Sequence, residues 1–148
     1  MRIVTVVTII TIALFASSVA AQRGNGAEAR DSAVVQLPPG NIAHGRYLAE
    51  HVANCVECHS GRDGAGNIID GEKYLGGNIP FAPPWVNDWA MRAPRNRGLV
   101  GYDDKAALRL LTEGAIGRDG RQLRPPMPRF RMTPQDAADV IAFLRSLH

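Results

Sequence analysis

Cysteine is scarce in this sequence: only Cys55 and Cys58 occur in 148 residues. No second cysteine pair and no nearby histidine pair could complete the four protein ligands of a structural zinc site. The sequence also lacks the glycine patterns of dinucleotide-binding and phosphate-binding loops. No constellation of a catalytic acid, base and nucleophile is visible. These absences argue against a zinc domain, a nucleotide-binding protein and an enzyme that works in its own right.

A large excess of charge of one sign is also missing. The formal net charge at pH 7 is +3, and it falls to +2 without residues 1–21, whose only charged side chain is Arg2. A charge this small does not indicate a nucleic-acid partner.

The sequence has one long apolar run, which extends from Ile3 to Ala16 directly after Arg2. Small residues follow it, and the run is a little short for a membrane-spanning helix. We therefore expect residues 1–21 to be a secretory signal peptide that is cleaved before Gln22. The alternative is a retained membrane anchor. Cleavage would leave a periplasmic protein without a membrane span.

Residues 22–40 are rich in Gly, Ala, Ser and mixed charges, and we expect a flexible leader there. The remaining residues, 41–148, are expected to form one small domain. The core of such a domain is thin, so a disulfide, a metal or a cofactor is usually needed to stabilise it.

Three segments carry the helical period of apolar residues: 41–55, 103–114 and 133–147. Each begins with a side chain that can accept a backbone N–H, namely Asn41, Asp103 or Asp104, and Thr133. The first helix is expected to continue to the neighbourhood of Cys58. We therefore predict an all-α domain.

Between the first two helices, residues 60–102 are rich in Gly and Pro and show no sustained period. A small hairpin turning at Asp70-Gly71 is conceivable from the residue types. A loop of this length is unusual inside a compact domain, and it is reasonable if the chain wraps around a large apolar group.

The motif CVECH places Cys55, Cys58 and His59 at i, i+3 and i+4, near one face of a helix. Two thiols at this spacing can reach the two vinyl groups of a haem, and the imidazole then lies beside the iron. The pentapeptide C-x-x-C-H is typical of covalent haem c attachment. A disulfide or a redox dithiol is the alternative, but a thioredoxin-type dithiol belongs in a βαβ unit.

The second axial ligand of such a haem could be a methionine. Met91, Met127 and Met132 are available, and Met127 lies between prolines in LRPPMPRF. Prolines stiffen the backbone and keep this segment out of a helix, so we predict Met127 as the ligand. Ligation by His51 is the competitor, although His51 is expected to be exposed, as are His44 and His148.

Residues 41–148 resemble a class I cytochrome c. The resemblance rests on Gly45 and Tyr47, on CVECH, on PPMPRF, and on the last helix with Phe143. The tail LRPPMPRFRMTPQDAADVIAFLRSL is similar to cytochrome c subunits and domains that accept electrons from bacterial alcohol and sugar dehydrogenases. The resemblance implies a small cytochrome c fold: three main helices around one covalently bound haem c, with long Gly/Pro-rich loops.

In that family the first and last helices cross closely, and Gly45 and Phe143 match the glycine and the aromatic at the contact. Many relatives have a proline soon after the haem histidine, whose carbonyl accepts the Nδ1–H. Here Ser60 and Gly61 follow His59 instead. We expect one of three other prolines to supply this acceptor: Pro80, Pro83 or Pro84.

Two sets of side chains could each have either of two roles. Trp85 and Trp89 either line the haem or fill ordinary core positions. Several arginines surround Met127, and they either compensate the haem propionates or form a docking rim for an acidic partner. These arginines are Arg118, Arg121, Arg124, Arg129 and Arg131.

The sequence thus predicts a periplasmic one-electron carrier. Cys55, Cys58, His59 and Met127 would bind one haem c, with His59 and Met127 on the iron. The resemblance implies a dehydrogenase as donor and an oxidase or another cytochrome as acceptor in a respiratory chain, with this protein acting alone or as a subunit of an oxidoreductase complex. The alternative is a haem c protein with an open or displaceable sixth site that acts as a small-ligand sensor or enzyme subunit.

Overall fold

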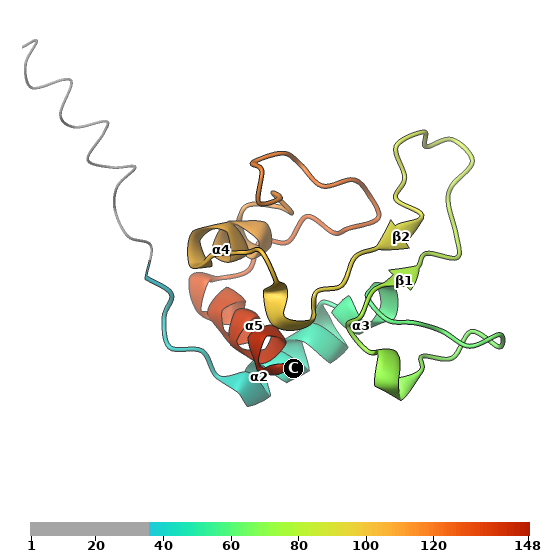
Figure 1. Ribbon diagram of the computed structural model, residues 1–148. Coiled ribbons are helices and arrows are strands. Elements are labelled where there is room, and N and C mark those ends of the chain that lie inside the picture. The colour runs from blue at the N-terminus through green and yellow to red at the C-terminus, as the bar shows by residue number, and fades with distance from the viewer. Residues whose placement is uncertain (1–35) are drawn as a thin grey trace, which may run out of the picture. The chain divides into compact units, whose positions relative to one another are not determined.

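The computed structural model describes residues 36–148 (Figure 1). The signal peptide expected at residues 1–21 lies outside the described residues, as does the expected leader up to residue 35. Within residues 36–148, no helix combines the length and the apolar character needed to cross a membrane.

The described part is mostly helix and loop, which confirms the predicted all-α class with three main helices. The first main helix consists of α2 followed by a π-helical turn, η1, and the other two are α4 and α5. The helical elements are α2 (Ile42–Tyr47), η1 (Leu48–Val52), α3 (Cys55–Cys58), η2 (Asp70–Glu72), η3 (Arg97–Leu99), α4 (Asp104–Thr112) and α5 (Pro134–Ser146). The two strands are β1 (Gly77–Asn78) and β2 (Arg92–Ala93).

The predicted N-caps of the main helices are present. The side chain of Asn41 accepts the His44 N–H at the start of α2, Asp103 accepts the Ala106 N–H at α4, and Thr133 accepts the Asp136 N–H at α5. Each bond satisfies one of the N–H groups that a first helical turn leaves without an intrahelical acceptor.

The sequence predicted that the first helix continues to the neighbourhood of Cys58, but the helix breaks before that residue. It ends in the π-helical turn η1, where the Ala53 N–H donates to the Leu48 carbonyl at 2.7 Å. Asn54 then adopts a left-handed conformation with φ of 50°, which asparagine tolerates better than most residues. The haem-type motif therefore lies on a separate short helix, α3.

The hairpin that the residue types allowed at Asp70-Gly71 does not form. These residues lie in the 3-10 turn η2, because the Glu72 N–H donates back to Ile69 at 2.8 Å. The antiparallel pair forms later, where Gly77 lies opposite Ala93 and Asn78 opposite Arg92.

Helix α5 forms the centre of the core, and α2 and α4 lie against it (Figure 1). Its buried side chains include Val140, Ile141 and Phe143, each at most 1% exposed. The end of the expected leader also contacts this helix. Leu37 packs on the core, and a Cβ on Gly40 would lie 2.5 Å from the Ala142 Cβ.

The crossing of α2 and α5 confirms the expected contact between Gly45 and Phe143. A Cβ on Gly45 would overlap the carbonyl oxygen of Asp139 and lie 3.0 Å from the Phe143 Cβ. Only glycine lets the two backbones approach this closely.

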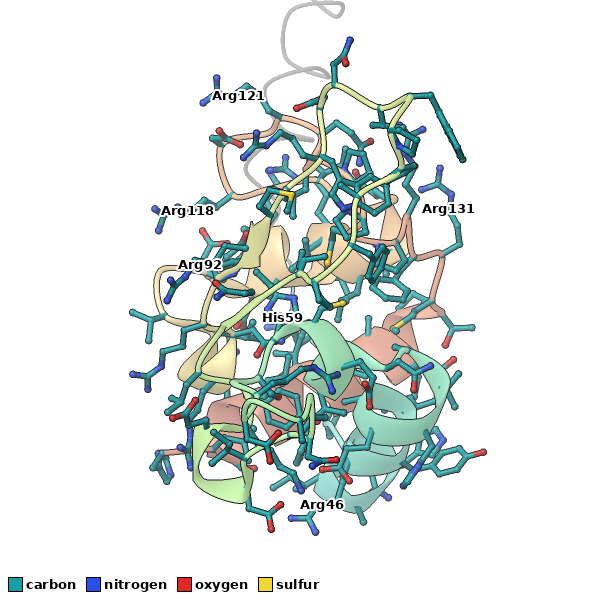
Figure 2. All side chains as sticks on the ribbon, turned by 90° about the vertical axis from the view of Figure 1, so that its right-hand side faces the viewer. Arg46, His59, Arg92, Arg118, Arg121 and Arg131 are labelled. Atoms are coloured by element: carbon teal, nitrogen blue, oxygen red, sulfur yellow. The ribbon has the colours of Figure 1, made fainter. Side chains whose placement is uncertain are left out.

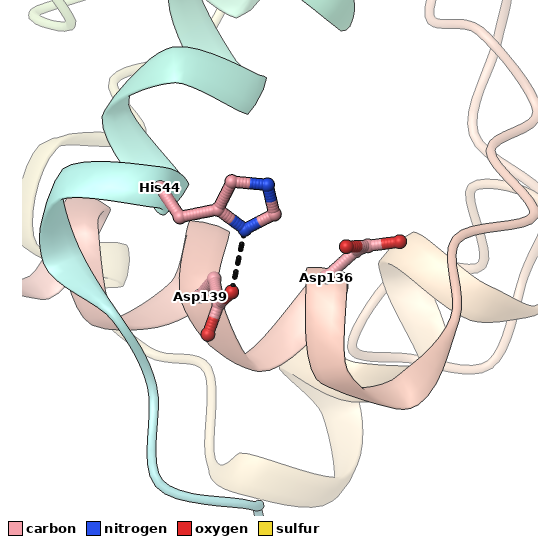
Figure 3. A group of neighbouring side chains, drawn as sticks. All are labelled: His44, Asp136 and Asp139. Atoms are coloured by element: carbon pink, nitrogen blue, oxygen red, sulfur yellow. Dashed lines mark hydrogen bonds and ion pairs between the residues drawn. The ribbon is translucent and has the colours of Figure 1, made fainter.

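Asp139 joins the same two helices through its buried carboxylate. It accepts the Asn41 backbone N–H at 2.7 Å, the His44 Nδ1–H at 2.8 Å (Figure 3) and the Gln135 amide at 2.9 Å. Burial acts to raise the pKa of Asp139, but these donors together hold the pKa below its ordinary value. The ionised carboxylate therefore stabilises the fold at neutral pH, and this contribution is lost as the pH falls below about 4.

Gly45→Ala is expected to lower the free energy of unfolding by about 3 kcal/mol, because the added methyl group forces the two helices apart. Gly64→Ala is the matched control, since a Cβ there meets no atom within 4 Å, and its effect should stay within about 0.5 kcal/mol. Chemical denaturation of the haem-loaded protein, followed by circular dichroism, measures both. Equal stability of the two variants would contradict the close crossing.

Candidate functional site

Both cysteines of the CVECH motif are free thiols in the structure, so they do not form the alternative disulfide. Burial raises the pKa of the Cys55 thiol to about 11 and also raises that of Cys58. Reactive redox dithiols instead contain a thiol with a lowered pKa, because the thiolate is the form that reacts. The pair therefore lacks the electrostatics of a redox dithiol, whereas protonated thiols are compatible with thioether formation.

His59 follows directly after α3 and is buried, with 8% of its surface exposed. Its Nδ1 lies 2.6 Å from the carbonyl oxygen of Pro94. A carbonyl only accepts, so Nδ1 carries the proton and Nε2 keeps a lone pair for a metal. Burial lowers the pKa of His59 more than the Pro94 bond raises it, which favours the neutral imidazole that a metal needs.

The acceptor for His59 is therefore Pro94, and the expectation that it would be Pro80, Pro83 or Pro84 is wrong. Pro94 directly follows strand β2, whose pairing with β1 returns the chain to the motif. The turn before β1 also contacts His59, because the Gly76 N–H donates to the His59 carbonyl at 2.9 Å.

Ser60 stands at the place where the sequence departs from the resembling family, and the structure gives it a structural role. It is 1% exposed, and its Oγ accepts the Tyr74 N–H at 3.2 Å. Nearby, a Cβ on Gly77 would overlap the Ser60 carbonyl oxygen. Residues 74–77 therefore hold the backbone that follows His59 in one position.

Met127 is half-buried against the core cluster, in what we term the Met127 segment, residues 123–132. The segment is held by backbone hydrogen bonds from Leu123 to Ala115 at 2.9 Å and from Met132 to Leu111 at 3.0 Å. Met132 is also half-buried on the core, whereas Met91 is 58% exposed. Met127 as an iron ligand stays a prediction.

The residues present fit a haem. Two thiols and a buried neutral imidazole with a free Nε2 form the donor set of the motif. In addition, three buried donors, Tyr74 Oη, Arg97 Nε and Arg109 Nε, have no hydrogen-bond partner among residues 36–148. Unpaired buried donors are uncommon in folded proteins, and a cofactor with two carboxylate groups offers acceptors for such donors.

The sequence model of the cytochrome c family matches residues 42–148, which is most of the chain. This protein belongs to the cytochrome c family. The family binds haem c covalently, and Cys55 and Cys58 fit its C-x-x-C-H motif. No curated protein matches the chain. Family membership makes the protein a haem-based electron carrier rather than a catalyst, with redox proteins as partners.

A hollow of about 630 Å³ borders Cys58 in this cytochrome c, between α3 and the start of the loop after β1. Ile79, Phe81 and Arg92 contribute to its lining, whereas His59 and Met127 do not. It is therefore not the space between the two expected axial ligands.

The two tryptophans differ in their surroundings. Trp85 is 81% exposed, so it does not fill a core position. Trp89 is half-buried and lies edge-on to Phe81. Its indole N–H donates to the Phe81 carbonyl at 2.8 Å, so this donor already has an acceptor within the protein.

All five arginines expected around Met127 are exposed. Arg121 pairs with Asp119 at 2.8 Å, and Arg124 approaches Asp88 at 3.7 Å. In the view of Figure 2, Arg118 and Arg121 lie on one side of His59 and Arg131 on the other, and Arg92 joins the first two. Arg92 is not expected here from the sequence, because it lies far from Met127 along the chain.

Ser60→Ala is expected to reduce the free energy of unfolding by about 2 kcal/mol, because the buried Tyr74 N–H loses its acceptor. Ser146→Ala is the control, since the Ser146 hydroxyl only donates to the Phe143 carbonyl at the end of α5. Guanidinium denaturation of the haem-loaded proteins measures both losses. If the Ser60 variant were no less stable than the Ser146 variant, Ser60 would not hold this turn.

Proposed function

We propose that this cytochrome c is a periplasmic one-electron carrier with one haem c, whose axial ligands are His59 and Met127. The observation that carries this proposal is the hydrogen bond from His59 Nδ1 to the Pro94 carbonyl, at 2.6 Å. It fixes the proton on Nδ1 and leaves the Nε2 lone pair available, in a side chain whose burial lowers the pKa and so favours the neutral imidazole. This is the state in which imidazole binds iron.

The bound haem supplies the redox chemistry, a one-electron change between ferric and ferrous iron. The protein contributes the attachment, the ligands and the exclusion of water. Cys55 and Cys58 would hold the group, and Pro94 holds His59 in one orientation. Met127 offers a thioether, a ligand that raises the reduction potential and closes the sixth position to small molecules.

The proposed donor is a bacterial dehydrogenase, and the proposed acceptor is an oxidase or another cytochrome of a respiratory chain. The support is the similarity of residues 123–147 to cytochrome c subunits that receive electrons from alcohol and sugar dehydrogenases. The protein would serve alone or as a subunit of such an oxidoreductase complex.

Met127→Ala should open the sixth position. The wild-type ferric protein is expected to show the near-red methionine–iron charge-transfer band and no spectral change with CO when reduced. The variant should lose the band and bind CO. Met132→Ala is the matched control, because Met132 is also half-buried on the core. A wild-type protein that is high-spin and binds CO rapidly would instead support the sensor or enzyme alternative.

Export can be tested by producing the full chain in a bacterium that has a cytochrome c maturation system. The signal peptide expected at residues 1–21 predicts haem-loaded protein in the periplasmic fraction, with Gln22 as its first residue. N-terminal sequencing checks this. Recovery of the uncleaved chain with the membranes would show that the segment serves as an anchor.

A further inference from the structure

Trp85 is the most exposed large apolar side chain among residues 36–148, at 81%. It lies in what we term the Trp85 loop, residues 79–91, which joins β1 to β2 and projects at the upper right of Figure 1. Phe81 and Met91 in the same loop are each 58% exposed. An indole offers one of the largest apolar surfaces of any side chain, and exposed apolar patches commonly mark interaction sites.

The Trp85 loop is held in shape by its own contacts. The strands β1 and β2 pair at its base. Above them, the Trp89 indole N–H donates to the Phe81 carbonyl at 2.8 Å, and the two rings meet edge to face with centroids 5.9 Å apart. The Val86 N–H donates to Pro83 at 3.2 Å beside the tip. A loop ordered in advance loses little conformational entropy when a partner binds.

The same loop contacts the Met127 segment. The Ala90 N–H donates to the Pro125 carbonyl at 2.7 Å, two residues before Met127. Arg124 of the segment approaches Asp88 of the loop at 3.7 Å. The exposed apolar loop is therefore continuous with the segment that carries the proposed sixth ligand.

Positive charge borders these two segments. Arg92 directly follows the Trp85 loop, and Arg129 and Arg131 lie in the Met127 segment. These three side chains are exposed and form no ion pair with a carboxylate of residues 36–148. An apolar centre with an arginine border is complementary to an apolar pocket bordered by carboxylates.

We propose that the Trp85 loop and the neighbouring arginines are the docking surface for the protein's redox partner, with Trp85 as the anchor. The partner is a protein with an apolar pocket that accepts an indole and with Asp and Glu side chains around it. The arginines accelerate encounter, and burial of Trp85 prolongs the complex, because Trp and Arg dominate the energetics of interfaces. This inference rests on the proposed electron-carrier function.

The test uses a defined surface with the partner's chemistry: a gold electrode coated with a mixture of carboxylate-terminated and methyl-terminated alkanethiols. Haem-loaded wild-type protein should adsorb and give a reversible one-electron wave. Trp85→Ser should bind about tenfold more weakly, as expected for the loss of one buried large apolar side chain. Val100→Ser is the matched control, since Val100 is 75% exposed but lies outside the Trp85 loop, and it should bind like the wild type.

Three outcomes would overturn the docking surface. Trp85→Ser could adsorb as tightly as the wild type. It could shift the reduction potential or the haem absorption spectrum, which would show that Trp85 lines the haem. Vesicles of phosphatidylglycerol could bind the wild type but not the variant, which would identify a membrane surface as the occupant. Absence of any reversible wave from the wild type would instead contradict the electron-carrier function itself.

Discussion

The hydrogen bond between His59 Nδ1 and the Pro94 carbonyl is the interaction on which the arrangement of this cytochrome c depends. It joins the attachment motif to a residue 35 positions later, and it explains the long Gly/Pro-rich segment between them. That segment turns through η2, holds Ser60 and the His59 carbonyl from residues 74 and 76, and returns along β2 to Pro94. The buried imidazole thereby receives one orientation and one tautomer, which a metal ligand requires. Without this bond, His59 would be a buried histidine with an unpaired N–H.

The sequence predicted the elements whose signals are local. The apolar period and the caps Asn41 and Thr133 identified the first and last helices, because a helix depends on neighbours within a few positions. The motif CVECH likewise showed the chemistry within five residues. The break at Asn54 was missed because a single left-handed residue inside a periodic segment has no apolar signature. The Pro94 acceptor and the buried Asp139 were missed for another reason. Both depend on contacts between distant segments. In addition, strands of two residues are too short to show the alternation of apolar and polar residues that identifies a strand.

The fold separates two tasks of an electron carrier. The crossing of α2 and α5, with Gly45 at the contact and Asp139 beside it, provides the rigid part on which the attachment motif is positioned. The Met127 segment and the Trp85 loop face outward with exposed arginines and an exposed indole. Buried groups thus set the state of the haem ligand, whereas exposed groups decide which partner can approach. Because Trp85 and the arginines are exposed, substitutions of these side chains should change encounter with a partner without changing the haem environment.

The proposed electron transfer requires one haem held between His59 and Met127. Proton NMR of the ferrous protein, with carbon-13 in its methionine methyl groups, tests this claim most directly. A methyl group bound beside the iron lies over the haem ring current and resonates far upfield of all ordinary methyl groups. One such signal is expected, and its assignment should place it on Met127. Ordinary positions for all methionine methyl groups, or an upfield signal that belongs to Met91 or Met132, would contradict it.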